Sequence, residues 1–434
     1  MSKKLLIKGL AVTLLSLAFS AQARETPRVY VEGVAAAIEE NYFDEARARE
    51  IAVKLRSAAS TGKFDALQNE GELSSELSRW LAPFDTHFKV SWAEPQPASP
   101  AAPDATAPAR AMPANNPQRR GNYGVRGVDV LPGNIGYLDL RNFSDFEFGQ
   151  PNQPARLAVD AGLQLLSGTN ALIIDLRENG GGAPQMVGYL SSAFVKKDAD
   201  IFNTFHGRGG RTMSEAPLDW NPQPRLDTPL FILISGRTAS AAEAFAYTMQ
   251  SSKRATIVGE ASMGAANPGG PVDAGNGFMV FISFASPINP ITKTNWENRG
   301  VIPDVAVASA AAPETAQRLA LKAVLAGGPK GDDATDVTWA LDALQAESKS
   351  TPLLHANDYL GSYGTLVITE ANGHLILNNG RRPIRTLLPL GDDHFAVRED
   401  PSKRVIFVRD ASGKVQALES QTSSGDSDRY RRGG

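Results

Sequence analysis

The sequence predicts an α/β fold in which mostly parallel strands form a central sheet. Short apolar runs alternate with amphipathic helical patterns, which is the order that βαβ units produce. The runs 171–176 and 230–234 are almost wholly apolar, as strands buried on both faces are. The spacing of apolar residues around them predicts helices over 154–166, 185–195, 240–251 and 312–325, and further strands over 135–140, 255–259 and 278–284.

Other parts of the chain have a different character from this core, which we expect over 122–330. Apolar residues at helical spacing in 28–82 predict an N-terminal helical layer, within a domain over 24–93. Seven prolines in 94–121 predict a linker or exposed loop, and whether it is a lid or a tether stays open. Alternating runs separated by turn signals predict an antiparallel β module over 350–419. The polar, glycine-containing residues 420–434 are expected to be a disordered tail.

Residues 1–23 have the form of a cleaved secretory signal. Met1-Ser-Lys-Lys4 is basic, the stretch to Ser20 is mostly apolar, and Ala21-Gln22-Ala23 has the small-x-small pattern of a cleavage site. No later run approaches the roughly 20 apolar residues that a membrane-spanning helix needs. We therefore expect an exported protein, periplasmic or secreted, without stable membrane insertion. Because it has 0 Cys, it must fold without disulfides.

Composition and motif spacing argue against several classes of partner. The formal net charge is −3 and there is no basic stripe, so nucleic acid is not an expected partner. There is no His-Glu-x-x-His pattern, no cysteine, no phosphate-binding lysine loop and no dinucleotide fingerprint, so we expect neither a metal nor a cofactor. The oligomeric state stays open, and a homo-oligomer is compatible with the sequence.

The segment Thr238-Ala-Ser-Ala-Ala-Glu243 has two interpretations. It follows the strand 230–234 and a turn over Ser235-Gly-Arg237, and it begins a helix, which is a position that suits a nucleophilic serine. Helix N-terminal N–H groups there would favour negative charge beside the Ser240 oxygen. However, Ser-x-x-Glu before an apolar helix is also the capping box, and this reading is the more frequent one.

Three further segments carry candidate residues, each with a simpler reading. His87 lies between the helical layer and the core, where a lone histidine is usually a surface or packed residue. The glycines ending at Gly182 follow a strand and could present backbone N–H groups to an anion, or simply make a tight turn. Glu297 lies in a loop near a strand, and a loop glutamate is normally solvated.

Taken together, these segments resemble the S41 serine peptidase family, which includes C-terminal processing peptidases, tricorn core proteases and the interphotoreceptor retinoid-binding protein. The resemblance covers about residues 28–325 and implies a crotonase-like or ClpP-like ββα superhelical core. Its motifs are Asp85-Thr-His87, Asp175-Leu-Arg-Glu-Asn-Gly-Gly-Gly182, Thr238-Ala-Ser-Ala-Ala-Glu243 with Gly259-Glu260, and Glu297-Asn-Arg-Gly-Val-Ile-Pro-Asp304.

The resemblance also points to one branch of that family. It implies that Ser240, rather than Ser235, is the nucleophile. In the processing peptidases a lysine follows Gly-Glu-x-x-x-Gly, but here Ala265 follows Gly264, and no PDZ segment is recognisable between 87 and 123. Thr86-His87 and Glu297 match the tricorn-like pattern instead.

The roles that the resemblance implies form a coherent mechanism. His87 would take the proton of Ser240, Glu297 would orient His87 through the Thr86 hydroxyl, and the N–H groups of Gly182 and Ala241 would hold the oxyanion. We expect hydrolysis of protein or peptide substrates, as an endopeptidase or a carboxypeptidase-like enzyme. Two alternatives remain: a non-catalytic binding protein for a peptide or apolar ligand, and a cell-envelope scaffold that docks through its β module.

Overall fold

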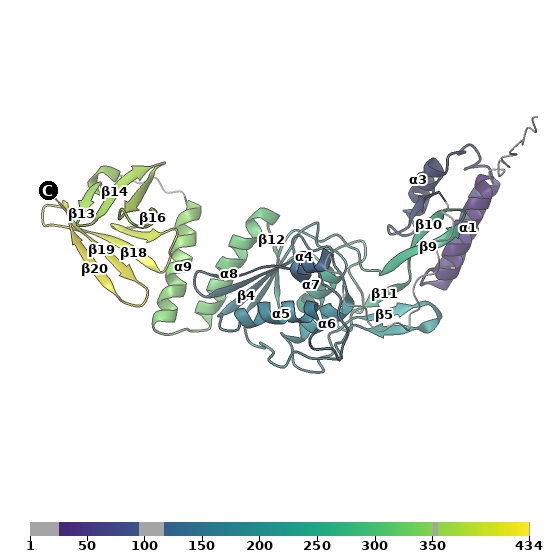
Figure 1. Ribbon diagram of the computed structural model, residues 1–434, viewed down its shortest axis with the longest axis horizontal. Helices are drawn as coiled ribbons and strands as arrows, with labels where there is room; N and C mark the ends of the chain where they lie inside the picture. Colours follow the sequence, from purple (N-terminus) through teal and green to yellow (C-terminus); the bar gives the residue numbers. More distant parts are fainter. Residues whose placement is uncertain (1–25, 95–116, 350–354, 434) are drawn as a thin grey trace, which may run out of the picture. The chain divides into compact units, whose positions relative to one another are not determined.

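The computed structural model describes residues 26–94, 117–349 and 355–433. The signal expected over 1–23 and most of the linker expected over 94–121 lie outside these residues. The chain divides into two compact units. Within the described residues, the first contains 26–40, 46–94 and 271–281, and the second contains 41–45, 117–270 and 282–433 (Figure 1).

The first unit combines a helical layer with a small sheet. Its helices bury the apolar residues that the spacing singled out, such as Val34, Ile51 and Leu77, all 0% exposed. They are α1 (Pro27–Asn41), α2 (Glu45–Ser60) and α3 (Glu70–Leu81). The sheet has the order β1-β10-β9, with β1 (Lys89–Trp92) antiparallel to β10 (Phe278–Ser283), and β9 spanning Gly269–Gly275. The strand expected over 278–284 thus exists, but it pairs with a strand that follows the helical layer rather than joining the central sheet.

The second unit contains the expected central sheet. Its strand order is β12-β8-β7-β4-β3-β2, parallel from β12 to β3, with β2 antiparallel at the edge. Every residue of β4 and β7 is buried, which explains their continuous apolar runs. The strands are β2 (Val125–Leu131), β3 (Ile135–Leu140), β4 (Ala171–Asp175), β7 (Leu230–Ile234), β8 (Thr256–Gly259) and β12 (Val305–Ala306).

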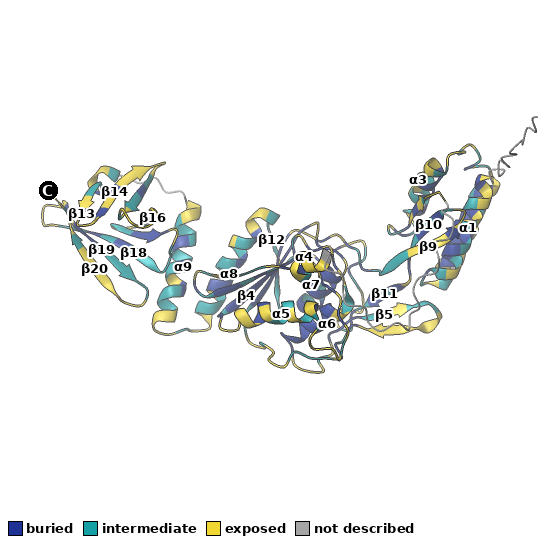
Figure 2. Ribbon diagram, viewed as in Figure 1, coloured by how far each residue is buried: buried dark blue, intermediate teal, exposed yellow. Residues whose placement is uncertain are grey.

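Helices cover both faces of this sheet, so the prediction of an α/β core is confirmed. One face packs against α5 (Pro154–Leu165), α6 (Pro184–Ser192) and α7 (Ala241–Ser251). The other packs against α8 (Ala312–Ala326) and α9 (Asp332–Lys349), a helix that the sequence analysis did not identify. The strands between these layers are largely dark blue in Figure 2, as expected for a buried sheet. The loops after β4 and β7 leave the same edge of the sheet, where α/β proteins commonly bind ligands.

Smaller elements connect this framework. The strands β5, β6 and β11 form a separate sheet of order β11-β5-β6. The bounds are α4 (Pro117–Arg120), η1 (Asn122–Gly124), β5 (Thr204–Gly207), η2 (Arg208–Gly210), β6 (Thr212–Ser214), β11 (Ala285–Ile288) and η3 (Ser309–Ala311). Among the described residues, no helix is both long and apolar enough to span a bilayer.

The C-terminal module is a closed barrel of eight antiparallel strands in sequence order. Closure comes from the Tyr363–Arg432 bridge and from the N–H of Gly433 donating to the carbonyl of Ser362 at 2.8 Å. The helix η4 (Ala356–Asp358) precedes the first strand. The strands are β13 (Gly361–Tyr363), β14 (Leu366–Ala371), β15 (His374–Asn378), β16 (Arg385–Gly391), β17 (His394–Val397), β18 (Lys403–Arg409), β19 (Val415–Thr422) and β20 (Ser427–Arg431).

The expectation of a disordered tail over 420–434 is therefore wrong for the described part of that segment. Residues 427–431 form β20, which pairs with β19 along its whole length. The sequence does not predict this strand because its residues are polar, and polar segments without an apolar pattern are typical of disorder. In a barrel, however, a terminal strand is held by backbone hydrogen bonds on both sides, whatever its side chains.

Candidate active site

Ser240 occupies a sharp turn between a buried strand and a helix. It follows β7 and immediately precedes α7, which begins at Ala241. Its backbone has φ 54° and ψ −122°, which lies outside the conformations that an L-residue readily adopts. Such strain costs about 1–3 kcal/mol and tends to persist at functional sites, including the strained serine turns of hydrolases. Ser240 is exposed there.

Ser235, the other serine of this segment, has a structural role. It is 3% exposed, and its hydroxyl donates to the carbonyl of Arg177 at 2.6 Å. The same oxygen accepts a hydrogen bond from the N–H of Arg237 at 3.1 Å. Because these contacts fix the turn that leads to Ser240, the geometry favours Ser240 as the reactive serine.

The glycines after β4 allow another backbone to lie directly against Ser240. Gly181 and Gly182 have φ 112° and 141°, values that favour glycine. A Cβ on Gly181 would lie 2.7 Å from the Cβ of Ser240 and 3.1 Å from the N of Ala241. Only a residue without a side chain therefore fits beside Ser240.

The fully buried Asn179 fixes this glycine loop. Its Oδ1 accepts from the N–H of Gly181 at 2.9 Å, and its Nδ2 donates to the carbonyl of Leu140 at 2.9 Å. Its own carbonyl accepts from the N–H of Ala239, which precedes Ser240. Asn179 thus joins the loop after β4 to the turn after β7, and the sequence analysis gave it no role.

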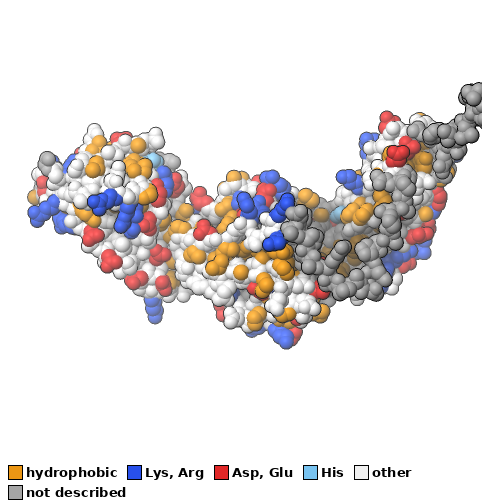
Figure 3. Space-filling model, viewed as in Figure 1, with side chains coloured by type: hydrophobic (Ala, Val, Ile, Leu, Met, Phe, Trp, Pro, Cys, Tyr) orange, Lys and Arg blue, Asp and Glu red, His pale blue; other side chains and the backbone are white. Residues whose placement is uncertain are grey.

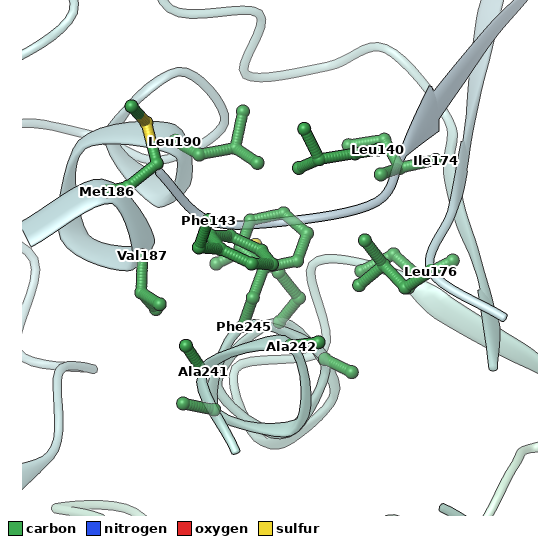
Figure 4. Close-up of a cluster of buried hydrophobic side chains, with 14 of the residues drawn as sticks. Leu140, Phe143, Ile174, Leu176, Met186, Val187, Leu190, Ala241, Ala242 and Phe245 are labelled. Atoms are coloured by element: carbon green, nitrogen blue, oxygen red, sulfur yellow. The ribbon is translucent and has the colours of Figure 1, made fainter. Parts of the chain in front are cut away.

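Two backbone N–H groups remain available near Ser240. Among the described residues, neither the N–H of Gly182 nor that of Ala241 donates a hydrogen bond. Ala241 is the first residue of α7, whose N-terminus carries partial positive charge. The first turn of this helix is anchored in the core, where Ala241, Ala242 and Phe245 lie beside Phe143 (Figure 4). This arrangement can hold an oxygen anion formed next to the serine.

Asp175, at the end of β4, stabilises the same edge of the sheet. Arg177 donates to it through Nε and Nη2, and the hydroxyl of Tyr137 donates to it at 2.5 Å. Burial raises the pKa of Asp175, but these hydrogen bonds outweigh burial and hold that pKa below its usual value. Because its oxygens are already occupied, Asp175 holds the loop rather than moving protons.

Glu243 connects α7 to the loop over 262–265. Ser240 and Glu243 have the capping-box arrangement, and the N–H of Ser240 donates to Glu243 at 2.8 Å. The buried carboxylate also accepts hydrogen bonds from the Ser262 hydroxyl and from the N–H groups of Gly264 and Ala265, at 2.5, 2.6 and 2.9 Å. The capping interpretation of the segment and a reactive Ser240 are therefore compatible.

Glu297 holds the next two residues of that loop. Its Oε2 accepts from the N–H of Ala266 at 2.7 Å and from the N–H of Asn267 at 3.0 Å. Glu243 and Glu297 therefore accept hydrogen bonds from consecutive residues of one loop. This loop links Glu297 to the helix that begins beside Ser240. Glu297 is only half-buried, but these contacts show that it is not simply a solvated loop residue.

His87 belongs to the first unit and is paired with a buried aspartate. Its Nδ1 lies 2.9 Å from Oδ1 of Asp85, and its backbone N–H donates to the same oxygen at 2.8 Å. The side chain of Asp85 is 3% exposed and that of His87 is 16% exposed. A carboxylate on Nδ1 fixes the ring and leaves Nε2 as the nitrogen that can take a proton.

The predicted site residues thus fall into two groups. In the second unit Gly181, the neighbour of Gly182, lies against Ser240 and Ala241, and the loop over 264–267 links Glu297 to them. His87 lies in the first unit with the exposed Thr86. The sequence analysis quoted Asp85 within a motif but gave it no role, although the spacing Asp-x-His suits a side chain that turns back onto the ring.

Comparison with known proteins finds similarity to a family of peptidases. The peptidase family S41 model matches residues 134–307, which include Gly182, Ser240, Ala241 and Glu297 but neither Thr86 nor His87. A carboxy-terminal-processing protease of Bartonella bacilliformis is 29% identical over 183 residues, covering 41% of this chain and 39% of that protein. Carboxyl-terminal-processing peptidase 2, chloroplastic, of Arabidopsis thaliana is 28% identical over 173 residues, covering 39% and 31%.

Among solved structures, a photosystem II D1 C-terminal processing protease is 18% identical, with a TM-score of 0.42, and the match covers 66% of this chain and 94% of that one. The chain spans less than two fifths of the length of the two curated relatives. The family model and the curated relatives together support membership of the peptidase S41 family.

Proposed function

We propose that this chain is an exported serine peptidase of the S41 type that hydrolyses peptide bonds of proteins or peptides, with Ser240 as the nucleophile. The observation that carries the proposal is the strained turn that presents Ser240 beside two N–H groups without acceptors, those of Gly182 and Ala241. A capping serine needs neither feature. An acyl-transfer site needs both an accessible hydroxyl and donors for the oxyanion.

The proposed base is His87. A serine hydroxyl is a weak nucleophile near neutral pH, so it needs a base within hydrogen-bond reach. In the proposed mechanism Nε2 of His87 takes the proton of Ser240 as the oxygen attacks the peptide carbonyl. The same nitrogen then gives the proton to the leaving amine, and water hydrolyses the acyl-enzyme with His87 again as base. The pairing of Nδ1 with Asp85 supports this role, because it fixes the ring and stabilises the imidazolium.

The tricorn-like assignment is part of the proposal. In that assignment Glu297 orients His87 through the Thr86 hydroxyl, and no lysine is required because Ala265 occupies the lysine position. Asp85 is a second candidate for the orienting role, supported by its contact with Nδ1. Comparing Glu297→Gln with Asp85→Asn separates the two, because the variant of the orienting residue loses kcat with the larger factor.

The test is hydrolysis of an unfolded protein, such as fluorescently labelled casein, by the full chain. Ser240→Ala and His87→Ala should each abolish hydrolysis while the far-UV circular dichroism stays unchanged. Ser251→Ala, in the same helix, is the matched control and should retain full activity. Undiminished hydrolysis by Ser240→Ala would refute the assignment. Binding of peptide by the wild type without any turnover would favour the binding-protein alternative.

A further inference from the structure

The C-terminal barrel is closed at one end by its own side chains. Phe395 and Phe407 meet in its interior with their rings edge to face. At the same end, Asp393 accepts hydrogen bonds from the hydroxyl of Tyr359 at 2.7 Å and from Arg409 at 2.8 and 2.9 Å. Aromatic packing and a partly exposed ion pair therefore close this end.

The other end of the barrel contains an open cavity of about 210 Å³. Its lining includes residues from the seven strands β14 to β20. The floor is apolar and is made by Leu366, Leu377, Val397 and Val405. Eight-stranded barrels either fill their interior with side chains or hold one small ligand, and here the interior is filled only in its sealed half.

Charged side chains point inward around this opening, as the strand register shows. Val405 lies opposite Ser420, which lies opposite Asp428, and opposed residues share one face of the sheet. Because Val405 is buried in the barrel core, Asp428 faces the interior as well. Arg385 lies opposite the inward Leu377, and Lys403 precedes Val405 by two residues.

Arg385 and Asp428 lie on opposite sides of the opening, and Lys403, on β18, lies midway between them. Arg385 is on β16 and Asp428 is on β20, which are four strands apart in a closed ring of eight. Lys403 and Arg385 share a single carboxylate, that of Asp400, at 2.9 and 3.7 Å, so these two side chains together keep surplus positive charge. Among the described residues, Asp428 has neither an ion pair nor a side-chain hydrogen bond. Side chains of both signs are also visible on this module, at the left of Figure 3.

We propose that this cavity is a binding site for a small zwitterion that carries an apolar group, namely a free apolar amino acid. The apolar side chain lies on the floor, the carboxylate faces Arg385 and Lys403, and the ammonium faces Asp428. The proposal concerns the barrel alone and does not depend on Ser240.

The size of the cavity agrees with this class of ligand. A cavity of about 150 Å³ holds benzene, so about 210 Å³ suits a ligand of roughly eight or nine non-hydrogen atoms. L-leucine is of this size. Larger ligands, which typically occupy cavities of about 300 Å³ or more, would have to extend out of the opening.

The test is calorimetric titration of the full chain with a matched set of ligands. L-leucine should show saturable one-site binding, whereas glycine, which lacks the apolar group, should show none. N-acetyl-L-leucine, which lacks the ammonium, and 4-methylpentanoate, which lacks the amine altogether, should bind at least about 10-fold more weakly. Leucyl-glycine and glycyl-leucine each lack one charged group beside the leucine side chain, so both should also bind more weakly than leucine, and preference for either dipeptide would contradict a site for a free amino acid. Equal binding of 4-methylpentanoate and leucine would overturn the proposal in favour of an anionic amphiphile, and the absence of leucine binding would overturn it altogether.

Variants separate the cavity from the rest of the surface. Asp428→Asn and Lys403→Met should each weaken leucine binding at least about 10-fold, and Leu377→Trp should abolish it by filling the cavity. The controls Glu419→Gln and Arg431→Met change charges on the outer face of the same strands and should leave binding unchanged. Leucine binding is compared only among variants whose thermal midpoint equals that of the wild type. Unchanged binding in a folded Asp428→Asn variant would show that leucine binds elsewhere.

Discussion

Ser240 illustrates how one residue can satisfy two interpretations that its sequence context leaves open. Ser-x-x-Glu predicts a capping box, and the N–H of Ser240 does donate to Glu243. Its φ and ψ angles, however, are not those of an ordinary helix cap, which is typically extended. No sequence pattern reports this strain, because it results from the surrounding fold rather than from the hexapeptide.

Asp85 provides a residue-level prediction that rests on the proposed mechanism. Replacing it by asparagine leaves the shape of the side chain but removes the charge that stabilises the His87 imidazolium and fixes its ring. Asp85→Asn should lower kcat by about 100-fold to 10,000-fold with little change in KM, measured on a peptide substrate. The matched control is Glu50→Gln on the exposed face of α2. A kcat within a factor of two of the wild type would exclude Asp85 from the mechanism.

Glu215 provides a pH-dependent prediction. It is fully buried; Nδ2 of Asn203 donates to its Oε2 at 2.7 Å, and its Oε1 has no partner among the described residues. Burial raises its pKa from 4.5 to about 8. Between these values the folded protein binds one more proton than the unfolded chain, so raising the pH destabilises the fold by up to about 1.4 kcal/mol per unit.

The measurement for Glu215 is the free energy of unfolding in urea from pH 5 to pH 8. Glu215→Gln should be less sensitive to pH over this interval and more stable than the wild type near pH 8. The control is the exposed Glu370→Gln. Parallel stability curves for the wild type and Glu215→Gln would contradict a neutral Glu215 in the folded protein.

At the scale of elements, the loop over 262–267 depends on two carboxylates. Glu243 and Glu297 accept the N–H groups of Gly264, Ala265, Ala266 and Asn267. Each oxygen of Glu243 accepts hydrogen bonds from two donors. A glutamine at this position would replace one oxygen by an NH2 group, which would then face other donors instead of accepting from them. Hydrogen bonds to a charged group each contribute about 1.5–3 kcal/mol.

Glu243→Gln should therefore lower the free energy of unfolding by at least about 2 kcal/mol and increase amide exchange over 262–267. Hydrogen exchange and urea unfolding measure the two effects, with Glu260→Gln as a nearby control. Unchanged exchange in this loop would show that the carboxylate does not hold it.

The elements differ in how far the sequence could predict them. The strands at 171–175 and 230–234 were identified because both faces are buried, which makes the pattern continuous. The helix α9 was missed because its apolar side faces two partners, α8 and the barrel, and its polar residues interrupt a simple stripe. The pairing of β10 with β1 joins residues nearly two hundred positions apart, which local patterns cannot predict.

At the scale of the whole molecule, the closure of the barrel depends on the last described residues. Deletion of residues 423–434 removes β20 and leaves β13 and β19 with open edges. Amides of β13 should then exchange on the order of 100-fold faster, because their local opening no longer breaks hydrogen bonds on both sides. Arg431→Met, which keeps the backbone, is the control. Unchanged exchange in β13 of the truncated chain would show that β20 does not close the barrel.

Some residues of the candidate site could be predicted from the sequence because their motifs lie next to the core strands of the whole fold. Gly182, Ser240 and Glu297 lie near the ends of core strands or in loops that such strands position. Their motifs therefore indicate where in the fold these residues lie. Asp85 and Asn179 act through the neighbours they hold, His87 and Gly181, and their roles became evident only from hydrogen bonds. The partnership of His87 with Ser240 remains a prediction, because the two residues belong to different units.

The most direct test of the central claim is covalent labelling of the full chain by a fluorophosphonate, followed by mass spectrometry of the labelled peptide. We expect one adduct, on Ser240, which forms in the wild type and in Ser251→Ala and is lost in Ser240→Ala. In His87→Ala the adduct should form on the order of 1,000-fold more slowly, because the base is missing. An adduct on another serine, or labelling of Ser240 at the same rate without His87, would contradict it.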